Sequence, residues 1–270
     1  MSHWRRCGVI RLRVVAVVVF LALVAGTVPS ADADEPLDSS AMSVLESMSD
    51  YVSGLETISL SFDSDIEVIT PELEKIQFTN SSTATVQRPD KIHAHRVGGY
   101  ADVEMWFDGA NVSVYGRSIN GYTQFELPGT LDHLIAALSA GHGVALPGSD
   151  LLLSNAFEVL SFGVLEAKHI GRGVIGGVEC EHLAFRNAET DWQLWVEVGE
   201  TPIPRKMVIT SKTLNCAPQY TIQITSWESG VVLAADAFEF SPPPGAELLG
   251  PDALIELDEL PQGAPSGGKR

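Results

Sequence analysis

The chain has 270 residues, of which 35 are acidic and 17 are basic, and its net charge is −18 at neutral pH. A surface of this sign repels phosphate backbones and anionic headgroups, which disfavours nucleic-acid binding and flat docking on an acidic membrane. Apolar residues make up 45% of the chain, enough to form the core of one medium-sized domain.

Residues 1–33 have the layout of a secretory signal peptide. Four arginines precede an unbroken apolar run over residues 14–25, and Ala31-Asp32-Ala33 supplies small residues before a predicted cut at Asp34. The run is too short to cross a bilayer, for which about 20 residues are needed. Cys7 precedes the run, so it cannot be the lipid-bearing cysteine that follows the run in a bacterial lipoprotein. We predict a periplasmic or secreted protein with no transmembrane anchor after processing.

Removal of the signal peptide leaves 13 basic and 34 acidic residues, a net charge of −21. Residues 34–248 have the length of a single domain. Residues 249–270 are rich in proline, glycine and acidic residues, a composition that predicts a mostly disordered tail.

The domain is predicted to begin with a helix. Asp38 or Ser39 can cap it by accepting a hydrogen bond from a backbone N–H. Gly54 can end it, because glycine tolerates the left-handed conformation. Between these positions one apolar stripe recurs at helical spacing. Its members are Ala41, Leu45, Met48 and Val52.

From residue 57 onward, apolar and polar residues alternate, which predicts half-buried strands. Asp108-Gly109 between two such runs is a strong hairpin signal. The strands predicted before the break at Pro128-Gly129 cover residues 57–68, 75–86, 91–97, 103–107, 111–115 and 122–126.

A helical insertion follows these strands. Thr130 caps a helix with one apolar face, and residues 150–160 form another helix or two short ones. A loop through Gly141, Gly143 and Pro147 joins the two segments. The apolar face of the first helix consists of Leu131, Leu134, Ile135 and Leu138.

Strands then return as an antiparallel meander with short loops. They are predicted at residues 164–170, 178–186, 192–198, 205–211 and 220–227, with a further edge strand around Phe238–Phe240. About ten strands, an N-terminal helix and a helical insertion make a mainly β (α+β) fold. A sheet of this size must curl, and its concave face is covered by the helices or left available to a ligand.

Two cysteines, Cys180 and Cys216, remain after processing. An even pair in an oxidising compartment favours a disulfide. The predicted strand order argues against one, because it places Cys180 near one end of the sheet and Cys216 near the other. Bridged Cα atoms lie within about 7 Å of each other. The sequence leaves both states open.

Several spaced motifs resemble a known family, the predicted periplasmic proteins called domain of unknown function 2092. The motifs are GGVECEHLAFR at 176–186, DWQLW at 191–195, PRKMVIT at 204–210, APQY at 217–220, RPD at 88–90, FDG at 107–109 with Tyr115, and PGTLD at 128–132. The resemblance covers roughly residues 38–248. It implies a fold similar to the LolA/LolB lipoprotein carriers, a curved, half-closed antiparallel β-barrel with helices in its hollow. The family has no settled activity, and a shared fold does not fix function.

Motifs for catalysis or metal binding are weak. The chain has no G-x-S-x-G elbow, no H-E-x-x-H motif, no phosphate-cradling glycine loop and no C-x-x-C pair. His93 and His95 share a strand face at a spacing that suits a metal, but no third ligand follows, so two solvated histidines are preferred. Cys180 and His182 also share a face, yet such positions are ~7 Å apart and lack an orienting third group. We predict no catalytic residue, no metal, no cofactor and no enzyme activity.

Two further segments allow two interpretations each. Trp192 and Trp195 lie on opposite faces of one strand. They form either an aromatic wall of a ligand groove or, as we prefer, core on one side and a surface under a covering loop on the other. Arg205-Lys206 forms a basic spot that could meet a headgroup or an acidic partner. The simpler interpretation pairs Arg205 with Glu197 across the strands.

The concave face carries the best functional argument. An acyl chain could replace a loosely packed helical lid there, with each buried methylene contributing ~0.8 kcal/mol. Glycines Gly141, Gly143 and Gly148 around the insertion allow such a lid to move. The inward-facing strand residues are Ile58, Leu60, Phe62, Ile76, Phe78, Trp106, Leu183 and Phe185. The lid residues are Leu134, Ile135, Leu138, Leu152 and Phe157.

These features together predict an exported periplasmic binding protein that holds a hydrophobic ligand, a lipid or lipoprotein acyl chain, in a half-barrel. The alternative is a non-catalytic protein-interaction or sensor module of the cell envelope. Such a module would bind a protein partner through its convex face, its edge strand or its acidic tail.

Overall fold

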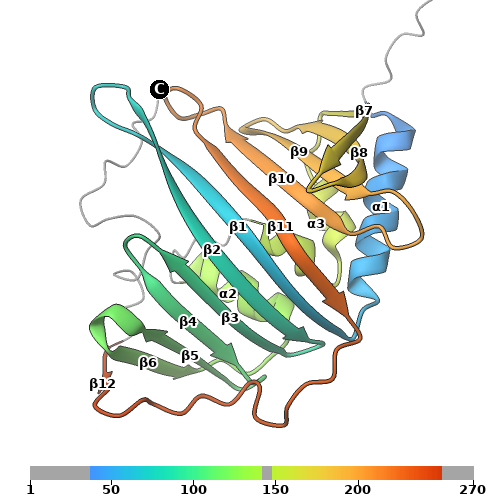
Figure 1. Cartoon of the computed structure of the whole chain (residues 1–270). Coiled ribbons are helices and arrows are strands. Elements are labelled where there is room, and N and C mark those ends of the chain that lie inside the picture. Colours follow the sequence, from blue (N-terminus) through green and yellow to red (C-terminus); the bar gives the residue numbers. More distant parts are fainter. Residues whose placement is uncertain (1–36, 142–147, 251–270) are drawn as a thin grey trace, which may run out of the picture. The chain divides into compact units, whose positions relative to one another are not determined.

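The structure is a computed structural model, and it describes residues 37–141 and 148–250 (Figure 1). The predicted signal peptide with its cut at Asp34, the loop positions Gly143 and Pro147, and residues 251–270 of the predicted tail lie outside these residues. None of the helices in the described part of the chain has the length and apolarity that a membrane crossing requires.

Helix α1 (Ser39–Ser53) begins and ends where the sequence predicts. The Asp38 carboxylate accepts a hydrogen bond from the Ser40 N–H at 2.8 Å, which satisfies a free donor of the first turn. Gly54 has φ −77°, a right-handed conformation, so the predicted left-handed ending is wrong. Its N–H donates to the Asp50 carbonyl at 3.1 Å and so continues the helical pattern. The predicted stripe is buried and consists of Ala41, Leu45, Met48 and Val52.

Within the described residues the sheet has twelve strands, where about ten were predicted. The first six are β1 (Thr57–Ile69), β2 (Lys75–Gln87), β3 (Lys91–Gly98), β4 (Asp102–Phe107), β5 (Asn111–Gly116) and β6 (Gly121–Glu126). The others are β7 (Glu166–Ile175), β8 (Val178–Arg186), β9 (Thr190–Glu197), β10 (Pro204–Ser211), β11 (Gln219–Ser229) and β12 (Glu247–Leu248). The strands β1–β11 therefore lie where alternation in the sequence indicates them.

The strand order is β12-β6-β5-β4-β3-β2-β1-β11-β10-β9-β8-β7. Neighbours are antiparallel except β12 and β6, which are parallel. β1 pairs with β2 on one side and with β11 on the other, so it joins two meanders at the middle of the sheet (Figure 1). β12 and β7 are the edges of the described sheet, which is open. The predicted architecture, a mainly β fold with an open antiparallel sheet, is confirmed.

The helical insertion between β6 and β7 consists of α2 (Leu131–Gly141), the 3₁₀ turn η2 (Ser149–Leu152) and α3 (Ala156–Ser161). The sequence predicted either one helix or two short helices over residues 150–160, and the structure has two short ones. The Thr130 hydroxyl accepts a hydrogen bond from the His133 N–H at 3.3 Å and caps α2 as predicted. Helices α1, α2 and α3 lie on the same side of the sheet (Figure 1). We call this side the helix-bearing face and the opposite side the outer face.

The core lies between the helices and the sheet, and its buried residues form one cluster. The members with the least exposed side chains include Leu45, Met48 and Leu134 from the helices and Ile58, Val86, Phe107, Leu183 and Leu194 from the strands. Because strand residues alternate in direction, these positions identify which residues of each strand face the helices.

The segment after β11 turns instead of forming the predicted edge strand at Phe238–Phe240, so that prediction is wrong. The N–H groups of Ala237 and Glu239 donate to the carbonyls of Ala234 and Asp236 at 3.2 and 3.0 Å. These hydrogen bonds close tight turns. The two backbone N–H groups are therefore not available to pair with a neighbouring strand. The edge strand is β12, several residues later.

Cys180 lies in β8 and Cys216 in the loop between β10 and β11, and both are free. The predicted position of Cys216 near the far end of the sheet is wrong. The reason is that β11 does not end the sheet but pairs with β1, which places the β10–β11 loop near the middle of the strand order.

Candidate functional site

The helix-bearing face is the site that the sequence indicates, and six of its predicted residues meet in one buried cluster. Strand residues Ile58, Leu60, Leu183 and Phe185 and helical residues Leu134 and Leu138 are all 7% exposed or less. Ile135, Leu152 and Phe157 are partly buried and pack against the same cluster. At this end of the sheet, the helices and the strands therefore meet closely.

The same face continues past the helices along the β1–β2 hairpin. Phe62 is half-buried and packs at the border of the cluster. Farther along β2, Phe78 is half-buried with its ring edge-on to Tyr100 at 5.4 Å, and Ile76 is 43% exposed. The predicted direction of these side chains agrees with the register. Ile76 is accessible, whereas Val68, which lies opposite it on β1, is buried at 6% exposure.

Trp106 does not belong to this face, and its predicted inward position is wrong. Its neighbour Phe107 is 0% exposed within the core, so Trp106 points to the outer face. There its ring stacks on His93 at 4.7 Å between centroids and packs on Phe240 at 5.0 Å. The alternation of Val103, Met105 and Phe107 is the sequence signal that identifies the inward set.

Sequence reasoning missed three polar residues on the helix-bearing face. Ser64 and Asn80 lie opposite each other on β1 and β2, and Ser82 lies opposite Phe62. All three are buried, at 1%, 3% and 8% exposure. Their signal in the sequence is a polar residue where the alternation requires an apolar one, since Ser64 comes two positions after Phe62 on the same strand.

A glycine makes room for one of these polar side chains. A Cβ atom at Gly98 would overlap Oδ1 of Asn80, so the Asn80 carboxamide occupies the space that any other residue at position 98 would fill. Gly98 pairs with Asn80, and Arg96 pairs with Ser82 on the same strand β3. Arg96 therefore shares the helix-bearing face with the three buried polar residues.

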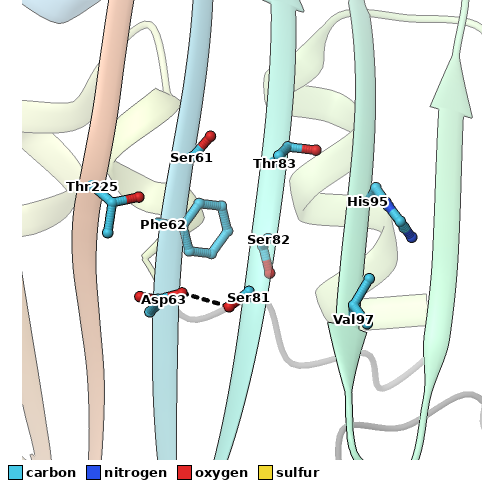
Figure 2. A pocket seen from close by; sticks show the side chains of 9 residues that line it. All are labelled: Ser61, Phe62, Asp63, Ser81, Ser82, Thr83, His95, Val97 and Thr225. Carbon is cyan, nitrogen blue, oxygen red and sulfur yellow. Dashed lines mark hydrogen bonds between the residues drawn. The ribbon is translucent and has the colours of Figure 1, made fainter.

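The outer face carries a shallow depression of about 260 Å³ across β11, β1, β2 and β3. Most of its lining residues carry a polar group, and Figure 2 shows Ser81 donating a hydrogen bond to Asp63, at 2.6 Å. His95 lies at its border with Nε2 2.7 Å from Oδ1 of Asp102. The lining residues are Ser61, Phe62, Asp63, Ser81, Ser82, Thr83, His95, Val97 and Thr225.

His93 and His95 share the outer face, as predicted, but they have different partners. His93 stacks on Trp106, and its Nε2 lies 4.0 Å from Glu104. Burial lowers the pKa of His93, against an opposing effect of Glu104. Within residues 37–141 and 148–250, no three His, Cys, Asp or Glu side chains are placed to hold a metal ion.

Cys180 and His182 also have separate surroundings. Burial raises the pKa of the Cys180 thiol, which keeps it protonated and a poor nucleophile. Nε2 of His182 donates a hydrogen bond to Oε1 of Gln193 at 2.9 Å, and the His182 ring stacks on Trp195 at 4.2 Å between centroids. We assign no catalytic role to this pair.

The preferred interpretation of the two tryptophans of β9 is confirmed for the core side only, since side chains of neighbouring strands, His182 and Lys206, contact Trp195. Trp192 is buried and stacks on Phe185 in the core, whereas Trp195 lies on the outer face with Lys206 5.6 Å from its ring centroid. The predicted cross-strand pair is confirmed, since Nε of Arg205 donates to Glu197 at 2.8 Å.

The fold and the site define a class of protein, an open antiparallel sheet with an apolar face under a helical cover. Over residues 41–249 the sequence matches the family described as predicted periplasmic protein, DUF2092, and the chain belongs to this family. The resemblance stated from the motifs is therefore confirmed. No curated protein matches the sequence significantly.

Several solved structures are similar to this chain. Lipoprotein LppX of Mycobacterium tuberculosis has 14% identity and a TM-score of 0.45, over 73% of this chain and 100% of that chain. LprF from Mycobacterium bovis has 12% identity and a TM-score of 0.46, over 73% and 97%. The MucA/MucB complex of Pseudomonas aeruginosa has 13% identity and a TM-score of 0.43, over 75% and 62%, so the match spans less than two thirds of that chain.

Proposed function

We propose that this protein works in the periplasm and binds a hydrophobic ligand, the acyl chain of a lipid or lipoprotein, on the helix-bearing face. The observation that carries the proposal is the accessible apolar surface along the β1–β2 hairpin, where Ile76 is 43% exposed beside half-buried Phe78. The β1–β2 pairing places this surface on the same face of the sheet as Ile58 and Leu60 of the buried core. An acyl chain would extend the core along the same face.

The proposed contacts follow from burial of apolar surface. Each methylene taken out of water contributes ~0.8 kcal/mol to the binding free energy. An acyl chain that covers the exposed end of the face would bury several methylenes. A longer chain would also displace part of the helical cover. The proposed ligand-binding residues are Ile58, Leu60, Phe62, Ile76, Phe78, Leu183, Phe185, Leu134 and Leu138.

Native mass spectrometry tests the proposal on the protein exported from its full-length gene and purified from periplasm without detergent. We expect a bound mass that organic solvent extracts as lipid. Phe78→Gln should lower the bound fraction, because it replaces apolar surface by an amide. Gln77→Ala is the matched control, since Gln77 is exposed and points to the outer face. A protein that stays free of ligand after incubation with envelope lipids would overturn the proposal.

A second candidate function is the binding of a protein partner at the edge strand β7. Ile170 and Val174 in this strand are 55% and 67% exposed, and Phe162 and Leu165 just before it are 83% and 56% exposed. An edge strand offers unpaired backbone groups to a strand of another chain. A photo-crosslinking residue at position 174 should then capture one defined partner in the periplasm, and the same residue at exposed Thr225 should not.

A further inference from the structure

We propose that the edge strand β7 binds an extended segment of another envelope protein, and that an acidic side chain of this segment contacts Trp195 and Lys206 on the outer face. This inference rests on the second candidate function, because it names the chemistry of the partner that the edge would bind. It does not depend on the hydrophobic ligand proposed for the helix-bearing face.

The free part of this edge is the second half of β7. The first half is already covered, because Leu37 pairs with Ala167 and the N–H of Asp38 donates to the Ala167 carbonyl at 3.1 Å. Between Ile170 and Val174, which are 55% and 67% exposed, no described segment pairs with the outer side of the strand. Beyond its bulge β7 has neither a proline nor a lysine, the residues that protect many natural edges from pairing. This half of the edge is therefore open to an added strand.

The ring of Trp195 borders this open half of the edge. A Cβ atom at Gly173 would lie 3.4 Å from Nε1 of Trp195, so the indole nitrogen lies beside the backbone of β7. A Cβ atom at Gly171, two positions earlier, would meet no atom within 4 Å. No side chain of β7 therefore separates the indole N–H from a strand added at the edge, and an outer-face side chain of that strand can reach it.

The Trp195 N–H is a donor that has no acceptor among the described residues. The ring itself is held in place, because it stacks on His182 at 4.2 Å between centroids and His182 donates to Gln193 at 2.9 Å. Tryptophan at a protein interface typically combines apolar contact with a hydrogen bond from its N–H. An acceptor on the partner would complete this pattern with the ring in its present position.

Lys206 makes the acceptor an acidic one. Its Nζ lies 5.6 Å from the Trp195 ring centroid, and within the described part of the chain no carboxylate lies within 4.0 Å of it. A carboxylate between these two groups would accept a hydrogen bond from the indole and form an ion pair with the lysine. The other basic residues on the outer face of β7–β10 already have acidic partners. They are Lys168 with Glu166, Arg186 with Glu166 and Asp191, and Arg205 with Glu197.

A second copy of this chain does not supply the acidic residue. The outer-face positions in the free half of β7 are Gly171 and Gly173, so two such edges in contact would place no acceptor beside Trp195. Two copies paired about Arg172 would also set like charges directly opposite each other, which destabilises a sheet. Each chain has a net charge of −18, which adds a general repulsion between copies. The partner is therefore a different protein.

The test uses the photo-crosslinking residue at position 174 in the full-length protein, exported in its native cells. Sequencing of the crosslinked peptide identifies the bound segment, and we expect it to contain an aspartate or a glutamate. Lys206→Gln should lower the crosslink yield about tenfold, the factor that one charge-assisted hydrogen bond contributes. Lys75→Gln, which removes the same charge from the distant strand β2, should leave the yield unchanged. Lys206→Glu should lower the yield further, and exchange of the partner's acidic residue for lysine should restore it.

A further variant separates a contact with the partner from a structural role. Trp195→Phe keeps an aromatic ring but removes the N–H, so it should lower the yield severalfold while hydrogen exchange in β8 and β9 stays the same. A crosslinked segment without an acidic residue, equal yields in Lys206→Gln and Lys75→Gln, or a crosslink to another copy of this chain would overturn this inference alone. Absence of any crosslink from position 174 would instead overturn the second candidate function on which it rests.

Discussion

At the scale of single residues, Asp38 joins the start of α1 to the edge of the sheet. Its Oδ1 accepts hydrogen bonds from the N–H and the hydroxyl of Ser40 at 2.8 and 2.6 Å, and its Oδ2 accepts one from the N–H of His169 in β7 at 3.0 Å. The Ser40 hydroxyl has the largest effect, and together these bonds lower the pKa of Asp38 to about 2. The carboxylate is therefore both a helix cap and a tie between two elements.

Asp38→Ala should lower the free energy of unfolding at pH 7 by about 1 kcal/mol, the usual contribution of a helix cap. Because the folded-state pKa is depressed, the contribution is complete above the unfolded value of about 3.9 and is lost as the pH falls toward about 2. Urea unfolding of both proteins between pH 7 and pH 2 measures the difference. Glu46→Ala, on the exposed side of α1, is the control. A difference that stays constant down to pH 2 would contradict the assignment.

Local sequence predicts some of these residue positions and not others. The cap at Asp38 was predictable because the acceptor and the donors are close in sequence. The right-handed ending at Gly54 was not, because a glycine accepts either conformation. Trp106 and Phe107 are both large and apolar, so neither residue alone shows which of them is in the core, and only the alternation with Val103 and Met105 does. That Ser64 and Asn80 lie side by side is recognisable only once β1 and β2 are paired.

At the scale of elements, the segment from residue 230 to residue 249 acts as a strap over the outer face. Phe240 packs on Trp106 and Tyr122, and Nζ of Lys91 lies 5.9 Å from the ring centroid of Phe238. The strap ends as β12, which pairs with β6. Its course could not be predicted from alternation, because its aromatic residues bind to side chains of other strands instead of extending the sheet.

Phe240→Ala should lower the free energy of unfolding by about 1–3 kcal/mol, since it removes two aromatic contacts and part of a buried ring. It should also expose Trp106 and shift the tryptophan emission to longer wavelength. Glu239→Ala changes the exposed neighbour in the same turn and should do neither. An unchanged emission spectrum in Phe240→Ala would mean that the strap does not cover Trp106 in solution.

At the scale of the whole described domain, β1 is the seam between two meanders. Ile58, at 0% exposure, pairs with Val86 of β2 and with Ser229 of β11. The strands of each meander follow from local alternation and short loops, and so they were predictable. The pairing of β1 with β11 joins segments far apart in the chain and has no local signal, which is why the predicted place of Cys216 was wrong.

Ile58→Ala should lower the stability of both meanders together, by about 2–5 kcal/mol, because the cavity forms at the seam that they share. Hydrogen exchange measured peptide by peptide should show equal loss of protection in β3–β5 and in β8–β9. Ser59→Ala, which points to the outer face, should leave both unchanged. Loss of protection in one meander alone would contradict the role of β1 as a common seam.

The position of β1 also fixes the order in which the sheet can be completed. A chain made from its N-terminus presents β1 first among the strands, but β11, one of its two partners, is the last long strand to arrive. Until then one side of β1 has no neighbour, and contacts of such long sequence separation form late and slowly. The complete sheet therefore cannot form until β11 has been synthesised. Before that point the core of the nascent protein stays open on one side of β1.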